Sequence, residues 1–220
     1  MTNGVLLLAG TVFFLLSEWR NPATLGREGA DVGTRLLGAF FQSVTMRTAG
    51  FNSVDLEGMN SASKLFASML MFIGASPVST GGGVKTTTMA ALFLIVLSVV
   101  KGQTDTNVFR RKLPADLVRR ALSIACISFG LTVACTMALT LCEQESVSFI
   151  DLLFESASAV ATVGVSAVGS PNLHAASRWF LIPAMYLGRI GPMTLALALA
   201  SRLGKAGNRV HYPEDQLLIG

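Results

Sequence analysis

Charged residues are scarce in this sequence. Of its 220 residues, 14% are Asp, Glu, Lys or Arg, and 51% are hydrophobic. An ordinary soluble domain carries about 25% charged residues. The composition therefore favours a membrane protein over a soluble enzyme. The two histidines, His174 and His211, fall in expected loops, where we expect no special role for them.

Cysteine is also sparse, and its spacing excludes several classes of site. Cys126, Cys135 and Cys142 show no C-x-x-C pair, so nothing indicates a zinc or dithiol motif, and small buried side chains are expected instead. The first residues lack the basic segment of a secretory signal. The first apolar run is therefore expected to be a retained membrane segment or the start of a fragment.

Basic residues are concentrated in two segments. The net charge is +4, and nine of the 17 Lys and Arg residues lie at 101–120 and at 202–209. Basic residues that flank apolar runs mark cytoplasmic loops. We therefore expect these segments to face the cytoplasm next to the lipid bilayer, and we expect no nucleic-acid binding.

Two of the predicted helices are short and amphipathic, and the other apolar runs are expected membrane segments. Helical spacing predicts two short amphipathic helices, 34–45 and 149–160, which are too short to cross a bilayer of about 30 Å. Ser148 and Asp151 have the spacing of a capping box for the second of these, and Ser61 or Ser63 is a candidate cap for the next helix. The remaining expected membrane segments are 5–16, 65–74 continued as 89–100, 117–142, and 179–203.

A short Thr-x-Gly loop follows each short helix. The sequence Ala-Thr-Val-Gly-Val-Ser at 161–166 has the pattern of a potassium selectivity filter, in which backbone carbonyl oxygens replace the water around a cation. Arg-Thr-Ala-Gly-Phe-Asn at 47–52 is its counterpart. The predicted ion-binding backbone comprises Thr48, Ala49, Gly50, Phe51, Thr162, Val163, Gly164 and Val165. We expect Gln42 and Glu155 to be structural polar groups behind these loops, and Arg47 to pair with an acidic residue.

An internal repeat relates the two halves of the chain. Met-Phe-Ile-Gly at 71–74 recurs as Met-Tyr-Leu-Gly at 185–188, and Thr-Ala-Gly at 48–50 recurs as Thr-Val-Gly at 162–164. The predicted fold is an all-α membrane protein with two parallel helix–pore-loop–helix repeats, each with a re-entrant half-helix and an extended filter loop. The predicted divisions are a pore repeat at 1–101, a cytoplasmic basic loop at 102–116, a pore repeat at 117–203 and a cytoplasmic tail at 204–220.

Two interruptions of apolar segments are candidate gating elements. The first contains Gly81, Gly82, Gly83 and Lys85 between two apolar halves. Glycine-interrupted apolar segments indicate binding or gating sites in transport proteins; the alternative is a helix kink without a regulatory role. The second contains Arg189, which is either an electrostatic barrier in a pore or a structural arginine.

The glycine run before Lys85 also invites comparison with a phosphate-binding loop. That motif requires Gly directly before Lys and a second Gly five residues earlier. Val84 and Ser79 occupy these places. A membrane nucleotide-binding enzyme is therefore disfavoured, and we expect neither enzymatic activity nor a cofactor in this chain.

Taken together, these stretches resemble the membrane subunit of the Ktr/Trk potassium uptake systems, in the superfamily that also includes the plant high-affinity transporters. Residues 41–52 resemble that family's third filter segment, 74–88 its intramembrane gating loop, and 154–164 its fourth filter segment. Residues 188–192 resemble the place where the family has an arginine below the filter, and 212–220 resemble its C-terminus. Members carry four repeats in one chain, so this chain resembles the C-terminal half.

The resemblance implies potassium transport through a carbonyl-lined filter, in the inner membrane of a bacterium, by a multi-pass protein. It also implies a cytoplasmic nucleotide-binding regulatory subunit, a homodimer or a missing N-terminal half, and Na⁺ as a possible coupled ion. Two alternatives stay open: a sodium or non-selective cation pathway, and a non-conducting half-transporter fragment that needs a second chain.

Overall fold

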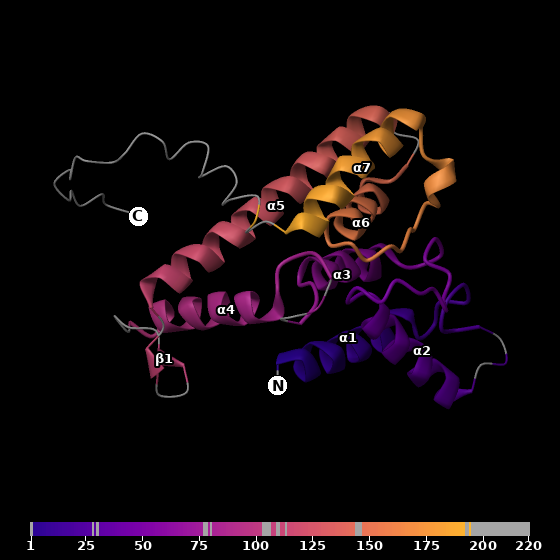
Figure 1. Cartoon of the computed structure of the whole chain (residues 1–220). Helices are drawn as coiled ribbons and strands as arrows, with labels where there is room; N and C mark the ends of the chain where they lie inside the picture. Colours follow the sequence, from indigo (N-terminus) through magenta and orange to yellow (C-terminus); the bar gives the residue numbers. More distant parts are fainter. Residues whose placement is uncertain are drawn as a thin grey trace.

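The computed structural model describes residues 2–27, 29, 31–76, 79, 81–102, 107–108, 111–112, 114–143, 147–191 and 194. Helices dominate this part of the chain (Figure 1). They are α1 (Thr2–Glu18), α2 (Val32–Thr45), α3 (Ser61–Phe72), α4 (Thr86–Val100), α5 (Ala115–Glu143), α6 (Phe149–Val160) and α7 (Ala175–Ile190), with a 3₁₀ turn η1 (Ser170–Asn172). Two strands of two residues each, β1 (Asn107–Val108) and β2 (Arg111–Lys112), pair antiparallel.

The helical class expected from the sequence is confirmed, with one small difference. The pair β1–β2 lies in the basic segment, where no apolar periodicity had indicated any structure. The short helices are found as α2 and α6, within two residues of their expected bounds. Helix α7 begins four residues before the expected 179, and the rest of that segment lies outside the described residues, apart from 191 and 194. The four-part division of the chain stays a prediction.

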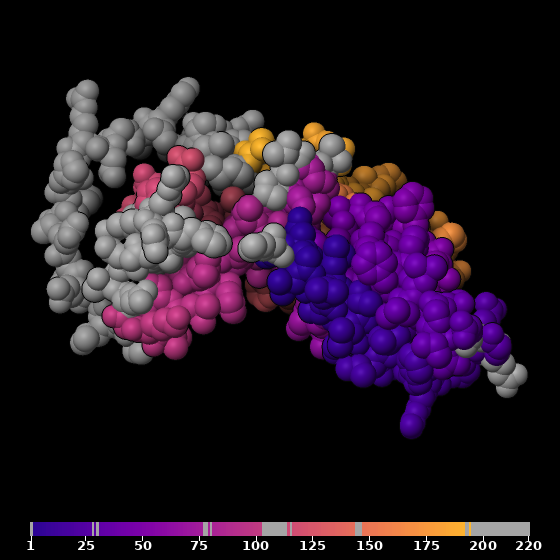
Figure 2. Space-filling view, turned by 90° about the horizontal axis from the view of Figure 1, so that it is seen from below, coloured from indigo at the N-terminus to yellow at the C-terminus, as the bar shows by residue number. Residues whose placement is uncertain are grey.

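Three helices are apolar along their length, and their outer faces are not covered by protein. Helix α5 is long enough to cross a membrane, whereas α1 and α4 are shorter apolar helices. With 17 residues, α1 is about 26 Å long. Both α1 (indigo) and α4 (magenta) reach the surface in Figure 2, and each exposes a stripe of apolar side chains. The stripe of α1 comprises Val5, Leu8, Val12 and Leu16, and that of α4 comprises Phe93, Val96 and Val99. Monomeric soluble proteins rarely show such large apolar patches.

The helices group into two units. Helices α1, α2 and α3 lie together in the N-terminal unit (residues 2–102), and α5, α6 and α7 lie together in the C-terminal unit (residues 114–191) (Figure 1). The units meet mainly where α3 packs on α6. A buried cluster continues across this boundary, because Val163 and Val165 pack with Phe14, Met46 and Met71.

A buried carboxylate joins the first and third helices in each unit. Glu18, at the end of α1, accepts hydrogen bonds from the backbone N–H of Asn60 (3.0 Å) and the hydroxyl of Thr24 (2.7 Å). Glu143, at the end of α5, accepts from the N–H of His174 (2.9 Å) and the hydroxyl of Ser177 (2.5 Å). Both carboxylates lie at the N-terminus of the third helix of their unit, where free N–H groups and the helix dipole favour negative charge.

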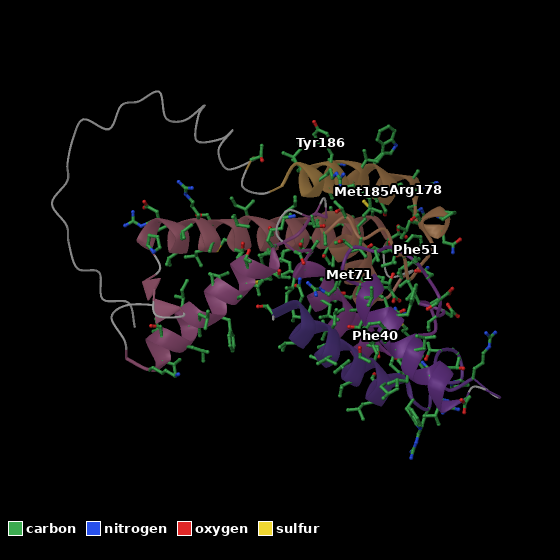
Figure 3. All side chains as sticks on the ribbon, turned by 60° about the horizontal axis from the view of Figure 1, so that its bottom comes forward. Phe40, Phe51, Met71, Arg178, Met185 and Tyr186 are labelled. Atoms are coloured by element: carbon green, nitrogen blue, oxygen red, sulfur yellow. The ribbon has the colours of Figure 1, made fainter. Side chains whose placement is uncertain are left out.

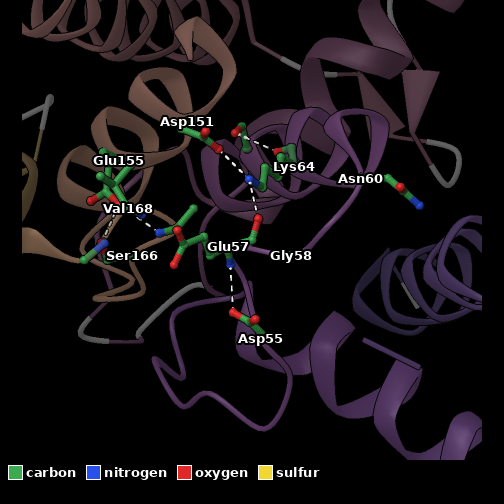
Figure 4. Close-up of polar contacts among 12 residues, drawn as sticks. Asp55, Glu57, Gly58, Asn60, Lys64, Asp151, Glu155, Ser166 and Val168 are labelled. Atoms are coloured by element: carbon green, nitrogen blue, oxygen red, sulfur yellow. Dashed lines mark hydrogen bonds and ion pairs between the residues drawn. The ribbon is translucent and has the colours of Figure 1, made fainter. Parts of the chain in front are cut away.

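An ion pair fastens the two units together. Nζ of Lys64 on α3 lies 2.6 Å from Oδ1 of Asp151 on α6, and it also donates to the carbonyl of Glu57 (2.9 Å) (Figure 4). The side chains are 8% and 20% exposed. The capping box predicted for Ser148 and Asp151 is wrong: Ser148 is the N-cap of α6 but makes no side-chain capping bond, and the carboxylate of Asp151 pairs with Lys64 instead. Asn60, rather than Ser61 or Ser63, is the N-cap of α3.

Breaking this ion pair should destabilise the chain. Lys64→Met leaves the carboxylate of Asp151 without its cation, which costs on the order of 3 kcal/mol for a largely buried pair. We expect the apparent melting temperature in detergent to fall by about 6–12 °C. The double variant Lys64→Met/Asp151→Leu should recover much of the loss, and Lys101→Met, at an exposed lysine, should change little. A single Lys64→Met variant as stable as the unmodified chain would contradict this role.

Candidate functional site

The two Thr-x-Gly loops have the same unusual backbone. Thr48 and Thr162 are the only non-glycine residues with positive φ in the described part of the chain (66° and 55°), and Gly50 and Gly164 follow with φ of 78° and 88°. Positive φ is uncommon for β-branched residues and costs roughly 1–3 kcal/mol, so surrounding contacts must impose it. In a regular strand, successive residues point their side chains and carbonyls to opposite sides of the chain. When every second residue has a positive φ, successive carbonyls point to the same side instead.

Each loop is fastened to the end of its short helix by one hydroxyl group. Oγ1 of Thr45 accepts from the N–H of Phe51 (2.8 Å) and donates to its carbonyl (2.5 Å). Oγ of Ser158 does the same for Val165, at 3.1 Å and 2.6 Å. The loops therefore cannot lift away from α2 and α6 without breaking both bonds.

The loop N–H groups point back to the helix ends, which leaves the carbonyls directed elsewhere. The N–H groups of Ala49 and Gly50 donate to the carbonyl of Thr45 (3.2 and 3.4 Å), and that of Val163 donates to the carbonyl of Ser158 (2.9 Å). Six backbone carbonyls, three in each loop, accept no hydrogen bond among the described residues. They belong to Thr48, Ala49, Gly50, Thr162, Val163 and Gly164.

The two loops meet at Gly50. A Cβ atom built on Gly50 would overlap the carbonyl oxygen of Val163, whereas one built on Gly164 would meet open space. The predicted ion-binding residues of the two units are thus brought together through this contact. Their side chains differ in exposure, because Val165 is 3% exposed and its counterpart Phe51 is 68% exposed.

The glycine run between α3 and α4 packs directly on the two threonines. The N–H of Gly82 donates to Oγ1 of Thr162 (2.7 Å), and a Cβ on Gly81 would lie 2.6 Å from Oγ1 of Thr48. Gly83, at φ 73°, packs against the end of α3. Any larger residue at Gly81 or Gly82 would push this loop away from the threonines.

The two basic residues predicted to gate have different surroundings. Nζ of Lys85 donates to the carbonyls of Ser79 (2.9 Å) and Gly81 (2.8 Å), which holds the glycine run in a closed turn. Arg189 lies in the last turn of α7, with an exposed side chain. The preceding residue, Gly188, directs its carbonyl toward Gly82.

The polar groups expected behind the loops lie there, with unequal bonding. Oε1 of Glu155 accepts from the N–H groups of Ala167 (2.8 Å) and Val168 (3.1 Å) and from the hydroxyl of Ser166 (2.5 Å) (Figure 4). Gln42 is 3% exposed, and its Oε1 has no hydrogen-bond partner in the described part of the chain.

The acidic partner expected for Arg47 is not found among the described residues. Instead, one guanidinium nitrogen of Arg47 donates to Oδ1 of Asn3 at the start of α1 (2.8 Å). This bond ties the residue that precedes Thr48 to α1.

Sequence reasoning missed the groups that join distant elements. Lys64, Asp151, Glu18 and Glu143 were not predicted to interact, although Lys64 was detectable as an ionisable residue in an apolar helix. The two glutamates share another signal, since each ends the first apolar helix of its unit.

Sequence comparison places the chain in a family. The profile described as "TrkH: Cation transport protein" matches residues 6–208. The "Ktr system potassium uptake protein B" of Vibrio alginolyticus is 39% identical over 216 residues, covering 98% of this chain and 46% of that protein. The "Potassium/sodium uptake protein NtpJ" of Enterococcus hirae is 35% identical over 220 residues, covering 99% of this chain and 48% of that protein.

Comparison with solved structures agrees on the fold. The crystal structure of the potassium transporter TrkH from Vibrio parahaemolyticus matches with a TM-score of 0.64 and 22% identity, over 90% of this chain and 42% of that one. The fold of this chain is thus similar to that of the matched part of this helical structure. The chain belongs to the TrkH family of cation transport proteins. It spans about half the length of the relatives that it matches.

The two filter glycines should respond differently to a methyl group. Gly50→Ala and Gly164→Ala both place a side chain at positive φ, which costs about 1–2 kcal/mol. Only at Gly50 does the methyl group overlap a backbone atom, the carbonyl oxygen of Val163. We expect Gly50→Ala to lower the stability of the chain in detergent by a further 1–3 kcal/mol or so. Equal melting temperatures for the two variants would argue against the loop contact.

Proposed function

We propose that the two Thr-x-Gly loops form half of a potassium-selective filter and that the chain contributes to transmembrane K⁺ transport. The observation that carries the proposal is the paired backbone at Thr48–Gly50 and Thr162–Gly164, with alternate positive φ and carbonyls that accept no hydrogen bond from the described residues. Such carbonyls can replace the hydration shell of a bare cation.

The short helices support the same function electrostatically. The C-terminal end of a helix carries a partial negative charge from its unpaired carbonyls. Helices α2 and α6 end directly at the two loops, and at about 21 Å and 18 Å they are too short to cross a membrane. In the proposed fold they are re-entrant half-helices that favour a cation at the loops, and each unit is one pore repeat.

The proposed gate is the glycine run between α3 and α4. It lies against both filter threonines, and its N–H at Gly82 presents a positive dipole end to the hydroxyl of Thr162. Lys85 places a further positive charge next to Gly81. Both groups oppose a cation at that place. Arg189 is proposed to add to the same barrier from α7.

Two alternatives have specific support. A sodium or non-selective cation pathway is favoured by the name of the Enterococcus hirae relative, which includes both potassium and sodium. A half-transporter that does not conduct alone is favoured by the coverage of about half of each relative. We propose no enzymatic activity and no cofactor in this chain in any of these cases, and K⁺ is the proposed cargo of the main hypothesis.

The proposed setting is a multi-pass protein of the bacterial plasma membrane. Family membership and the apolar helix α5 support the membrane location. We propose a cytoplasmic nucleotide-binding subunit as regulatory partner, since the Ktr relatives are named as parts of a system.

The filter assignment can be tested with Gly164→Ser in a four-repeat context. The chain is expressed with the complementary half of its Vibrio alginolyticus relative in a bacterium that lacks its own K⁺ uptake systems. Growth on limiting K⁺ should be rescued. Gly164→Ser should reduce discrimination of K⁺ over Na⁺ several-fold in flux assays, because a side chain at φ 88° displaces the carbonyls. Gly169→Ser, also at positive φ (79°) but after the filter loop, should keep selectivity. Unchanged ion preference in Gly164→Ser would reject the filter assignment.

The gate assignment predicts a gain of flux. Deletion of residues 81–83 in the same system should raise uncontrolled K⁺ flux, because the loop can no longer reach the threonine hydroxyls. Uptake of a K⁺ tracer into vesicles is the measurement. Reduced flux in a correctly inserted protein would instead assign these glycines a structural role.

A further inference from the structure

One buried polar atom of the N-terminal unit has no partner in the described part of the chain. Oε1 of Gln42 makes no hydrogen bond there, although the side chain is only 3% exposed. The amide nitrogen of the same side chain makes one weak bond, to Sδ of Met59 at 3.7 Å. A buried acceptor without a donor is costly. Such a group in a folded chain therefore points to a further partner, of which ordered water is the commonest.

The equivalent residue of the C-terminal unit shows which donors belong at this place. Glu155 is the counterpart of Gln42, because each stands three residues before the hydroxyl residue that holds its loop. Oε1 of Glu155 accepts hydrogen bonds from the backbone N–H groups of Ala167 (2.8 Å) and Val168 (3.1 Å). In this unit the side chain therefore binds the backbone that follows the filter loop directly.

The corresponding N–H groups of the N-terminal unit are not bonded to Gln42. The two filter loops are related by 114 positions, which pairs Ala167 and Val168 with Ser53 and Val54. Neither of these two N–H groups donates a hydrogen bond to the described residues. An acceptor and donors that bond directly in one unit thus stay apart in the other.

Both sides of this missing bond line one small cavity. Its volume is about 10 Å³, and its walls are Phe14, Glu18, Leu25, Gln42, Val54 and Met59. Apart from Val54, which is half-buried, each of these side chains is at most 6% exposed. The volume is about that of one water molecule, and the walls offer polar groups for it.

We propose that this cavity binds one ordered water molecule, which links Gln42 to the backbone of Val54. The water accepts a hydrogen bond from the N–H of Val54. It donates one hydrogen to Oε1 of Gln42 and the other to the carboxylate of Glu18. That carboxylate has room for it, because its oxygens offer about four acceptor positions and the described residues donate to three. A buried water typically makes about three such bonds.

The water gives the first filter loop a weaker connection than the second loop has. Glu155 holds the backbone at 166–168 through a charged acceptor, and charge-assisted hydrogen bonds are roughly twice as strong as neutral ones. At Gln42 the link runs through a neutral amide and a molecule that can exchange with solvent. The site goes beyond the proposed function, since it stands whether or not the loops conduct ions.

Radiolytic labelling of the purified chain in detergent tests for this water. X-rays convert water, including buried water, into hydroxyl radicals, which oxidise the nearest methionine, and mass spectrometry of peptides measures the added oxygen. We expect Met59, in the cavity wall, to be oxidised several-fold faster than Met46 and Met71. These two controls are fully buried in the same cluster, and Figure 3 shows Met71 inside the helix assembly.

A substitution at Gln42 separates this water from bulk solvent as the source of the label. Gln42→Leu removes the acceptor and keeps a side chain of similar size, so oxidation of Met59 should fall to the level of the two controls. Ser68→Ala removes another buried hydrogen-bonding group of the same unit, away from the cavity. It should leave the oxidation of Met59 unchanged.

The melting temperature gives a second readout, and its sign depends on the water. If the water is bound, Gln42→Leu removes one of its partners, and the melting temperature in detergent should fall by about 2–4 °C. In a dry cavity the same substitution would remove an unpaired buried acceptor and raise the melting temperature.

Any one of three results would overturn the proposal. The first is oxidation of Met59 no faster than that of Met46 and Met71, which is measured on the unmodified chain and needs no variant to fold. The others are undiminished oxidation of Met59 in Gln42→Leu and a higher melting temperature of that variant.

Discussion

The arrangement of the site depends on the approach of the Val163 carbonyl to Gly50. Carbonyl oxygens that point toward a shared axis repel one another, so a pair of such loops is held only if other bonds fix each backbone. Here the fixation comes from behind: one hydroxyl at the end of each short helix binds both polar groups of the residue after the filter glycine. The ion pair between Lys64 and Asp151 then holds the two loops at this separation.

Local patterns in the sequence were sufficient for the helices and loops, and insufficient for the contacts between them. The short helices were predictable, because an amphipathic stretch of about 12 residues bounded by polar residues has few other structures available. The loops followed from the Thr-x-Gly repeat. Asp151 was misassigned as part of a capping box because spacing within a helix cannot reveal Lys64, which lies 87 positions earlier. Glu143 and Ser177 are 34 positions apart in sequence and likewise become neighbours only through the packing of helices.

Equivalent residues of the two units differ in how much of their side chain is exposed. Several hydrogen bonds recur in both units, such as those of Thr45 and Ser158 to the loops, so differences in exposure between equivalent residues report what stands beside each unit. Phe51 is 68% exposed and its counterpart Val165 3%, whereas Met185 is 47% exposed and its counterpart Met71 is fully buried.

The small size of glycine lets the segment between α3 and α4 approach the two filter threonines closely. Gly81 and Gly82 bring a backbone close to the hydroxyls of Thr48 and Thr162, a distance that any Cβ would prevent. At that distance the N–H of Gly82 occupies one acceptor position of a hydroxyl, and a threonine hydroxyl has only two. A cation that uses Thr162 as a ligand would share this oxygen with the N–H of Gly82, whose positive dipole end repels it. In the proposed pore, ion occupancy at the inner end of the filter and closure of the loop therefore oppose each other.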